Sequence, residues 1–332
     1  MPNISVVIAT KNREEQLRVV SLASLKRQHD APPFEVIVWD ASDNDQSRAV
    51  VEQFTAENPG ISIRYCKAPR VGLARQRNDA VKEANGEIVF FIDDDSEVSP
   101  DGIRALSEMF AADDRIVGGC LPLDYNFPEG TKPANLRATG LWALFLKGCY
   151  GLFEPSKKAS GIFPPIAPSR RGSIFYLFGC DMAFRKEIFA THRFEERLQR
   201  FSNYALSDDL IFSRVLIQEG HELRVAKEGY VIHWPGSGGR LKSGFETGRV
   251  EGFNAGLIWL ILALPGSRWT VFPFIWARMG CFCAVLLPCL RWPWQINRWG
   301  RVGGYITGLW IFFWEEFFGL TRRKPSTGLR SE

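Results

Sequence analysis

The sequence lacks the features that would place it in a specialised class of proteins. Its 332 residues contain no internal repeat and no low-complexity tract, and hydrophobic residues make up 45% against 23% charged. This is the usage of an ordinary globular chain, and it excludes a disordered, collagen-like or coiled-coil protein. The formal net charge is only +4. The length corresponds to roughly two domains.

Two further absences bear on the cellular compartment. The seven cysteines are odd in number, and no two of them have the spacing of a zinc site. We therefore expect reduced, buried thiols, as in cytosolic proteins. Met1 leads almost directly into the apolar run at 4–8, with no basic segment before it. A signal peptide is not expected, and the body of the protein is predicted to stay in the cytosol.

Charge and tryptophan are unevenly distributed along the chain. Residues 253–332 carry nine Arg and Lys against three Glu, together with eight of the 11 Trp. Because Trp and Arg beside apolar runs are typical of a membrane interface, residues 251–332 are predicted to form a hydrophobic, helical, membrane-associating tail. A nucleic-acid partner is not expected, because the rest of the chain is slightly acidic and the basic tail is apolar.

The tail could meet a membrane in more than one way. Segments 269–290 and 302–320 have about the length of a spanning helix, but Arg278 lies inside the first and Glu315 and Glu316 inside the second. A charge in mid-span is costly, whereas a helix lying in the interface can place that charge in water. Interfacial or re-entrant helices, a two-span hairpin and soluble oligomer contacts are the alternatives, and the oligomeric state stays open.

The first 120 residues alternate between short β-branched runs and helix-like segments. One helical segment begins with Asn12 followed by Glu15, which is the spacing of a capping box. The alternation predicts an α/β fold with a Rossmann-like, mostly parallel central sheet flanked by helices, in which ligands bind at the carboxyl ends of the strands. The predicted strands are 4–9, 34–39, 61–65, 87–92 and 116–121, and the predicted helices are 12–28, 46–57, 72–84 and 100–112.

Residues 122–173 differ from the rest, because they are rich in Pro, Gly and Ser and contain little regular pattern. An insertion of this kind is often functional. Regular structure is predicted to return in strands at 174–178, 182–184, 223–226 and 230–233, and in a helix at 207–219 with Ser207 as N-cap. We divide the chain into a domain of residues 1–250, with halves 1–121 and 122–250, and the tail 251–332.

Three consecutive carboxylates, Asp93, Asp94 and Asp95, follow the apolar run 90–92. Like charges this close repel one another unless a cation lies among them. Hard oxygen ligands favour Mg²⁺ or Mn²⁺, and such an ion could hold a diphosphate. The alternative is an acidic turn that is solvated at the end of a strand.

Five other residues could carry chemistry. Asp208 and Asp209 open a predicted helix, where an acid can cap the helix or take a proton from a hydroxyl. His233 closes a strand and is either structural, a metal ligand or a proton shuttle. Arg75 lies in the first turn of a helix opened by Gly72, which could receive an anion. Asp40 ends the second predicted strand, where it serves the turn or contacts a ligand.

Taken in order, these segments closely resemble the family 2 glycosyltransferases, which have the GT-A fold. The resemblance covers about residues 3–235 of the chain. The matching segments are Ala9-Thr10-Lys11-Asn12-Arg13, the stretch that begins at Asp40, the helix from Gly72 to Glu87, the Asp93-Asp94-Asp95 motif, Phe178-Gly179-Cys180-Asp181-Met182-Ala183-Phe184-Arg185, Phe194-Glu195-Glu196, Asp208-Asp209-Leu210 and His233.

The resemblance implies an inverting sugar transfer from a nucleotide-sugar donor, expected to be UDP-linked, to an acceptor hydroxyl. It implies that Asp209 is the general base and that Asp95 and Asp93, completed by His233, bind Mn²⁺ or Mg²⁺. The donor would be held by Ala9, Thr10, Asp40, Arg75, Asp93, Asp94, Gly179, Asp181 and Asp208. Together with the tail, it leads us to expect a lipid-linked glycan acceptor in cell-envelope or exopolysaccharide biosynthesis, at the cytosolic face of the membrane.

The sequence departs from the family pattern at two positions. Asp208 stands where Glu is usual, and Ala41 replaces a second acid after Asp40. A processive synthase is one alternative, but its signature at 295–299 lies 86 residues after Asp209, farther than is usual. Nucleotidyl transfer is less favoured, because residues 9–13 contain no glycine. A non-catalytic membrane-anchored scaffold is the third alternative, although it predicts loss of acids that are present here.

Overall fold

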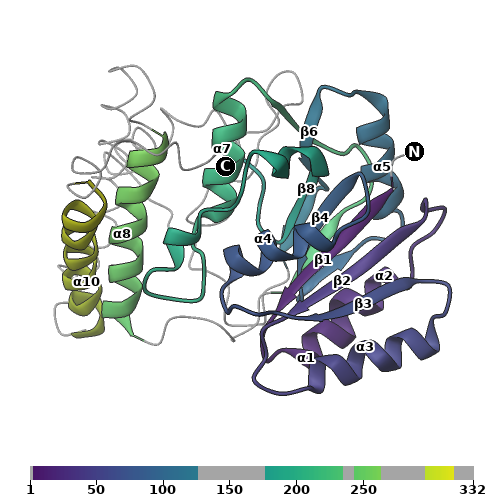
Figure 1. Ribbon diagram of the computed structural model, residues 1–332, viewed down its shortest axis with the longest axis horizontal. Coiled ribbons are helices and arrows are strands. Elements are labelled where there is room, and N and C mark those ends of the chain that lie inside the picture. The colour runs from purple at the N-terminus through teal and green to yellow at the C-terminus, as the bar shows by residue number, and fades with distance from the viewer. Residues whose placement is uncertain (1–2, 126–175, 235–242, 263–295, 318–332) are drawn as a thin grey trace, which may run out of the picture.

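A seven-stranded sheet forms the centre of the computed structural model, which describes residues 3–125, 176–234, 243–262 and 296–317 (Figure 1). The strand order is β3-β2-β1-β4-β8-β6-β9. Neighbouring strands are parallel except at β8, which is antiparallel to both β4 and β6. The predicted α/β fold with a mostly parallel sheet is thus confirmed. The strands are β1 (Ile4–Thr10), β2 (Phe34–Asp40), β3 (Ser62–Lys67), β4 (Ile88–Asp93), β6 (Ile116–Cys120), β8 (Asp181–Arg185) and β9 (Glu222–Val225).

Helices cover both faces of this sheet. On β4, Val89 and Phe91 enter one core and Phe90 enters the other, because successive side chains of a strand alternate between faces. Strands buried on both faces read as continuous apolar runs, which made them recognisable in the sequence. The first face is covered by α4 (Leu73–Glu83) and α7 (Asp208–Gln218), and the second by α3 (Gln46–Glu57), α5 (Gly102–Ala112) and the helical stretch after β1. Two short 3₁₀ helices, η2 (Lys186–Ala190) and η3 (Glu196–Gln199), follow β8.

The helical stretch after β1 differs from the predicted continuous helix. It consists of α1 (Glu14–Gln16), a π-helical turn η1 (Leu17–Leu22) and α2 (Ala23–Leu25). The predicted capping box is wrong, because Asn12 has a left-handed φ of 53° and exchanges hydrogen bonds of 2.8 and 2.9 Å with Asp43. Asn12 therefore ties this turn to the loop that follows β2.

A small three-stranded sheet stands beside the main one. It has the order β5-β10-β7 and consists of β5 (Ser96–Val98), β7 (Leu123–Tyr125) and β10 (Val231–His233). Its pairing places His233 opposite Ser96. The backbone N–H of Trp234 then donates to the carbonyl of Asp95 at 2.8 Å. This sheet brings the end of β10 to the turn that follows β4.

The part of the tail that the structure describes is helical. It contains α10 (Ile296–Phe312), a π-helical turn η4 (Phe313–Phe317) and the greater part of α8 (Gly244–Leu262), which crosses the predicted boundary between residues 250 and 251. Through Phe253 and Leu257, α8 joins the core on the α7 side of the sheet. Among the helices described, none combines the length and the apolar character needed to cross a bilayer. The candidate segment 269–290 and most of the insertion 122–173 lie outside the described residues.

α8 and α10 lie side by side (Figure 1), and glycines allow their backbones to touch. The two helices run in the same direction, because Gly248 faces Arg301 and Gly252 faces Tyr305. A Cβ at either glycine would overlap the facing carbonyl oxygen, and Gly304 meets α8 in the same way. Small residues spaced four apart in the sequence commonly allow two helices to approach this closely.

Replacing Gly252 by Ala is expected to destabilise the protein by about 1–3 kcal/mol, the usual cost of overpacking. The added methyl group would overlap the carbonyl oxygen of Tyr305, which belongs to a helix backbone and cannot move alone. Gly303→Ala is the matched control, since nothing lies within 4 Å of its Cβ position. That control is expected to stabilise the helix by about 0.5–1 kcal/mol. Urea unfolding measures both, and equal stabilities would contradict close packing of α8 on α10.

Candidate active site

The candidate site lies where several strands of the two sheets end. β1 ends at Thr10 and β4 ends at Asp93, and these neighbouring strands are parallel. β8 begins at the same edge because it runs in the opposite direction, with Asp181 opposite Ile92. Carboxyl ends of parallel strands are the usual ligand-binding edge of an α/β sheet.

The acidic turn after β4 is neutralised by its neighbours. Arg13 forms an ion pair with Asp94 at 3.0 Å and a second one with Asp95, and the hydroxyl of Thr10 donates to Asp94 at 2.7 Å. Burial raises the pKa of Asp94 to about 7, against the opposing charge of Arg13. Burial also opposes ionisation of Asp95, but the hydrogen bond and charge of His233, together with Arg13, outweigh it and hold its pKa at about 2.

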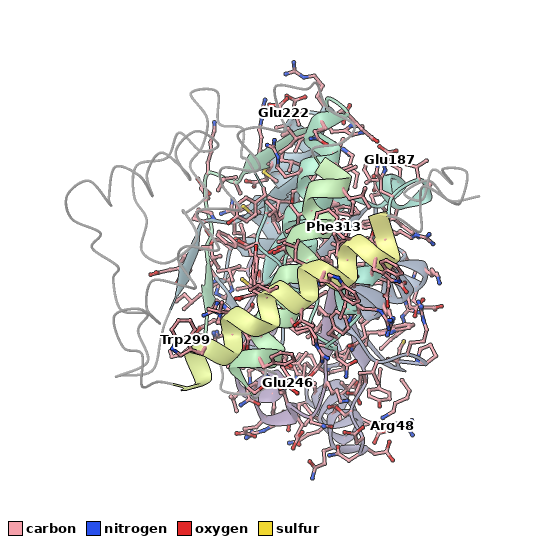
Figure 2. The ribbon with its side chains drawn as sticks, turned by 90° about the vertical axis from the view of Figure 1, so that its left-hand side faces the viewer. Arg48, Glu187, Glu222, Glu246, Trp299 and Phe313 are labelled. Carbon is pink, nitrogen blue, oxygen red and sulfur yellow. The ribbon has the colours of Figure 1, made fainter. Side chains whose placement is uncertain are left out.

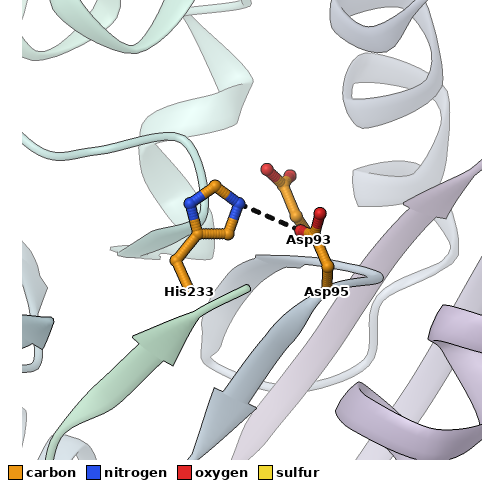
Figure 3. Close-up of side chains that lie close together, drawn as sticks. All are labelled: Asp93, Asp95 and His233. Carbon is orange, nitrogen blue, oxygen red and sulfur yellow. Dashed lines mark hydrogen bonds and ion pairs between the residues drawn. The ribbon is translucent and has the colours of Figure 1, made fainter. Parts of the chain in front are cut away.

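Asp93, Asp95 and His233 form a three-residue cluster (Figure 3). One potential ligand atom from each lies within 4.8 Å of the others, and Nε2 of His233 is 3.0 Å from Oδ1 of Asp95. Burial lowers the pKa of His233, but its hydrogen bond to Asp95 and the charges of both acids raise it overall. Two carboxylates and an imidazole are a donor set that suits Mn²⁺ and accommodates Mg²⁺. The residues therefore fit a divalent cation.

Asp209 lies in the first turn of α7 and is held by backbone groups. One of its carboxylate oxygens accepts the N–H of Gly179 at 2.9 Å, and the other accepts the N–H of Leu210 at 2.7 Å. Its low-dielectric surroundings and the charge of Asp208 raise the pKa of Asp209 to about 6, although the two N–H donors and Arg77 oppose the shift. A carboxylate with this pKa can accept a proton near neutral pH.

The start of α7 is capped differently from the expectation. Ser207 occupies the N-cap position, as predicted, but it has a left-handed φ of 76° and its side chain makes no capping hydrogen bond. Instead, Oδ1 of Asp208 accepts the N–H of Asp209 at 2.9 Å. Burial raises the pKa of Asp208, while Arg77 opposes that shift. The acids therefore satisfy the helix terminus themselves.

Arg77 and Arg13 are the site residues that the sequence reasoning missed. The buried guanidinium of Arg77 donates to Asp208 at 2.7 Å and to Asp93 at 3.2 Å. A signal was present, because Arg77 is three residues after Ala74 and four before Val81. That spacing puts a charged residue on the buried, apolar face of α4, where it needs a charged partner.

The other predicted donor-binding residues lie around this edge of the sheet. Asp40 is fully buried at the end of β2 and accepts the hydroxyl of Tyr65 at 2.9 Å. Ala9 lies on β1 between β2 and β4. Arg75 is not brought to the acidic cluster by the contacts observed, since its guanidinium donates to the carbonyl of Val71 at 3.2 Å and lies 3.6 Å from Glu196.

Asp181, the first residue of β8, is 1% exposed. One of its oxygens accepts the N–H of Leu121 at 3.2 Å, and the other has no partner among the described residues. Burial raises its pKa well above the ordinary value for an Asp. Of the described cysteines, Cys120 and Cys180 are buried free thiols near this residue, and Cys66 is a half-buried free thiol.

Comparison of the sequence with known proteins identifies one family. The model described as Glycosyl transferase family 2 matches residues 5–193. A GalNAc(5)-diNAcBac-PP-undecaprenol beta-1,3-glucosyltransferase of Campylobacter jejuni is 29% identical over 125 residues, which are 36% of this chain and 39% of that protein. The lipopolysaccharide core biosynthesis glycosyltransferase LpsC of Rhizobium meliloti is 24% identical over 56% of this chain and 72% of its own length. The chain thus spans well under half of the Campylobacter relative.

Solved structures share the fold. Mannosyltransferase PcManGT from Pyrobaculum calidifontis, in complex with GDP-Man and Mn²⁺, has a TM-score of 0.53 and 18% identity over 93% of this chain and 88% of its own. TarS 1–349 from S. aureus, in complex with UDP-GlcNAc, has a TM-score of 0.56 and 17% identity over 94% of this chain and 80% of its own. These likenesses establish the GT-A-like α/β fold.

Proposed function

Because the chain belongs to glycosyl transferase family 2 and is a glycosyltransferase, we propose that it moves a sugar from a UDP-linked donor to a hydroxyl of a lipid-linked glycan, with inversion at the anomeric carbon. The reaction would serve cell-envelope or exopolysaccharide biosynthesis. The observation that carries the proposal is the cluster of Asp93, Asp95 and His233 with Asp209 held beside it through Arg77 and Gly179.

The chain's own residues supply the proton transfer and the donor contacts. Asp209 takes the proton from the acceptor hydroxyl, whose oxygen then attacks the anomeric carbon as the bond to the diphosphate breaks. Asp93, Asp95 and His233 would hold a divalent cation, which when bound stabilises negative charge on the departing nucleotide. Thr10, Asp40 and Asp94 lie at the same edge of the sheet and would bound the nucleoside pocket.

The proposed acceptor class rests on two supports. The Campylobacter relative is named for an acceptor linked to undecaprenyl diphosphate. Exposed apolar side chains lie along α10 and η4, among them Trp299 and Phe313, which are labelled in Figure 2. Trp310 on α10 is 63% exposed and Trp314 in η4 is 66% exposed. An enzyme that acts on a lipid-linked glycan works at the surface of a membrane, and an exposed tryptophan face suits that surface.

The first test is nucleotide release from a panel of UDP- and GDP-sugars, with a membrane-lipid extract as acceptor source. We expect release from one donor with Mn²⁺ or Mg²⁺, loss of that release in EDTA, and recovery when the metal is added back. A wild-type protein that neither binds nor turns over any donor would refute the catalytic proposal. Release that persists unchanged in EDTA would refute the metal requirement alone.

The second test addresses the membrane. We propose that α10 docks on anionic bilayers, since its sequence is followed by Arg322-Arg323-Lys324 and basic groups near an anionic surface are each worth about 1 kcal/mol. Replacing Trp310 and Trp314 by Gln is expected to weaken cosedimentation with phosphatidylserine vesicles by about tenfold or more, because burying one large side chain is worth about 1.5–3 kcal/mol. Val19→Gln is the control, since Val19 is 48% exposed on η1. Unchanged binding of the variant to vesicles would contradict membrane docking. So would a variant that binds vesicles normally but no longer forms a dimer that the wild type forms.

A further inference from the structure

One buried guanidinium connects the predicted metal ligands to the predicted base. We propose that Arg77 is a positioning residue that fixes Asp209 relative to Asp93, so that acceptor activation depends on it more than donor binding does. The inference rests on the proposed glycosyl transfer. It concerns a residue to which the sequence pattern assigned no role.

Arg77 joins three segments that are far apart in the chain. From α4 it donates to Asp93 at the end of β4 at 3.2 Å, to the carbonyl of Gly179 at 2.7 Å and to Asp208 on α7 at 2.7 Å. Arg77 is 2% exposed, and the central carbon of its guanidinium lies 5.7 Å from the centroid of the Phe194 ring. A buried charge with three acceptors is held firmly in place, because losing any one of them is costly.

The path from Arg77 to the base passes through one residue. Gly179 accepts from Arg77 with its carbonyl and donates its N–H to Asp209 at 2.9 Å. A Cβ on Gly179 would lie 3.1 Å from the guanidinium and 3.5 Å from the carboxylate of Asp209. The packing between Arg77, Gly179 and Asp209 is therefore tight, and a shift of Arg77 would be transmitted to the base.

The geometry requires arginine in particular. A guanidinium presents its donors in a fixed planar fork that can reach several acceptors at once, whereas an ammonium is a point charge on a flexible stem. A lysine at this position could keep the positive charge but could not hold Asp93, Gly179 and Asp208 together. Among the charged groups that bear on Asp209 are Asp208 on its own helix and Arg77 from α4, and the titratable side chains of Cys180 and Tyr204 also interact with it.

The test begins with Arg77→Lys. Removing a residue that holds a metal ligand in place typically lowers metal affinity or activity about 10–100-fold. We expect kcat to fall by that factor. Calorimetric dissociation constants for Mn²⁺ and for the donor are expected to change by a smaller factor, since Asp95 and His233 are untouched. A folded Arg77→Lys variant with wild-type kcat, or with donor affinity falling in proportion to kcat, would overturn the inference.

A second variant covers the case in which Arg77→Lys does not fold. Asp208→Asn keeps an acceptor oxygen but weakens the anchor of Arg77 and removes the like charge beside Asp209. We expect kcat to fall and the acidic limb of the pH profile to move to lower pH. Loss of the Asp208 charge moves the acidic limb whatever Arg77 does, so kcat at the pH plateau decides. A folded variant with the wild-type plateau kcat would overturn the inference.

Arg185→Lys is the matched control. Arg185 is a largely buried arginine at the far end of β8, where it donates to the carbonyls of Ile116 at 2.9 Å and Phe110 at 2.8 Å. We expect it to change thermal stability without changing kcat. If the wild type fails to turn over any donor, the proposed function and this inference both fall. If the wild type is active and both variants match it, only the inference falls.

Discussion

Asp209→Asn is expected to lower kcat by about 10²–10⁴-fold, the range that general acid–base catalysis contributes. The amide cannot take a proton from the acceptor hydroxyl, but it keeps the size of the side chain and one oxygen that can accept from Gly179 or Leu210. Donor binding measured by calorimetry is expected to stay close to that of the wild type. Asp114→Asn is the control, because the Asp114 side chain is 99% exposed and pairs only peripherally with Arg185 at 3.3 Å.

The same variant has a signature in the pH profile. The pKa of Asp209 is raised to about 6, and only the ionised carboxylate can act as a base. Wild-type kcat/KM is therefore expected to be full above this pKa and to fall about tenfold for each pH unit below it. Asp209→Asn should remove that acidic limb. If the limb persists unchanged in the variant, another group is the base.

Asp95→Asn is expected to reduce Mn²⁺ affinity and kcat together, by more than the roughly 100-fold upper range for outer-shell partners. Asp95 provides one of the two carboxylates in the cluster, and its pKa of about 2 means that it is fully ionised at neutral pH. Titration calorimetry with Mn²⁺, with nucleotide release on the same preparations, measures both effects.

Asp94→Asn is the control for that experiment, because it is adjacent in sequence and equally buried. Asp94 interacts with Thr10 and Arg13 and lies outside the cluster. We expect Asp94→Asn to alter Mn²⁺ affinity far less than Asp95→Asn. Equal losses in the two variants would mean that the negative charge of the turn, and not ligation by Asp95, attracts the cation.

The sheet could be predicted because its strands are buried on both faces. Apolar runs such as 88–92 need no knowledge of their neighbours to be recognised as strands. The position of β8 could not be read from the sequence, since its pairing with β4 and β6 is decided by contacts between residues far apart in the chain. The side-chain caps expected at Asn12 and Ser207 are absent for a related reason. Both residues have left-handed backbones, and residue type alone does not reveal that conformation.

The candidate site was partly accessible to sequence reasoning. Carboxylates at the end of a buried strand need a cation or water beside them. This requirement predicted a cation site at Asp93 and Asp95. A buried role for Arg77 was not predicted, because a basic residue near the start of a helix is usually exposed to solvent. Its guanidinium is buried among distant segments, where it meets Asp208 of α7 and the ring of Phe194. That meeting joins residues that are 131 positions apart, and no local pattern encodes it.

The placement of β8 also has a consequence for how the protein is made. β4 and β6 are both synthesised by residue 120, yet the strand that joins them begins at Asp181. Until the ribosome has released that strand, both β4 and β6 present unpaired edges, and such edges recruit other chains. His233 is synthesised later still, so the cluster of Asp93, Asp95 and His233 is completed only after the central strands have been made. Expression of a fragment ending near residue 121 should therefore give aggregates, and rescue by chaperones should matter most during this interval of synthesis.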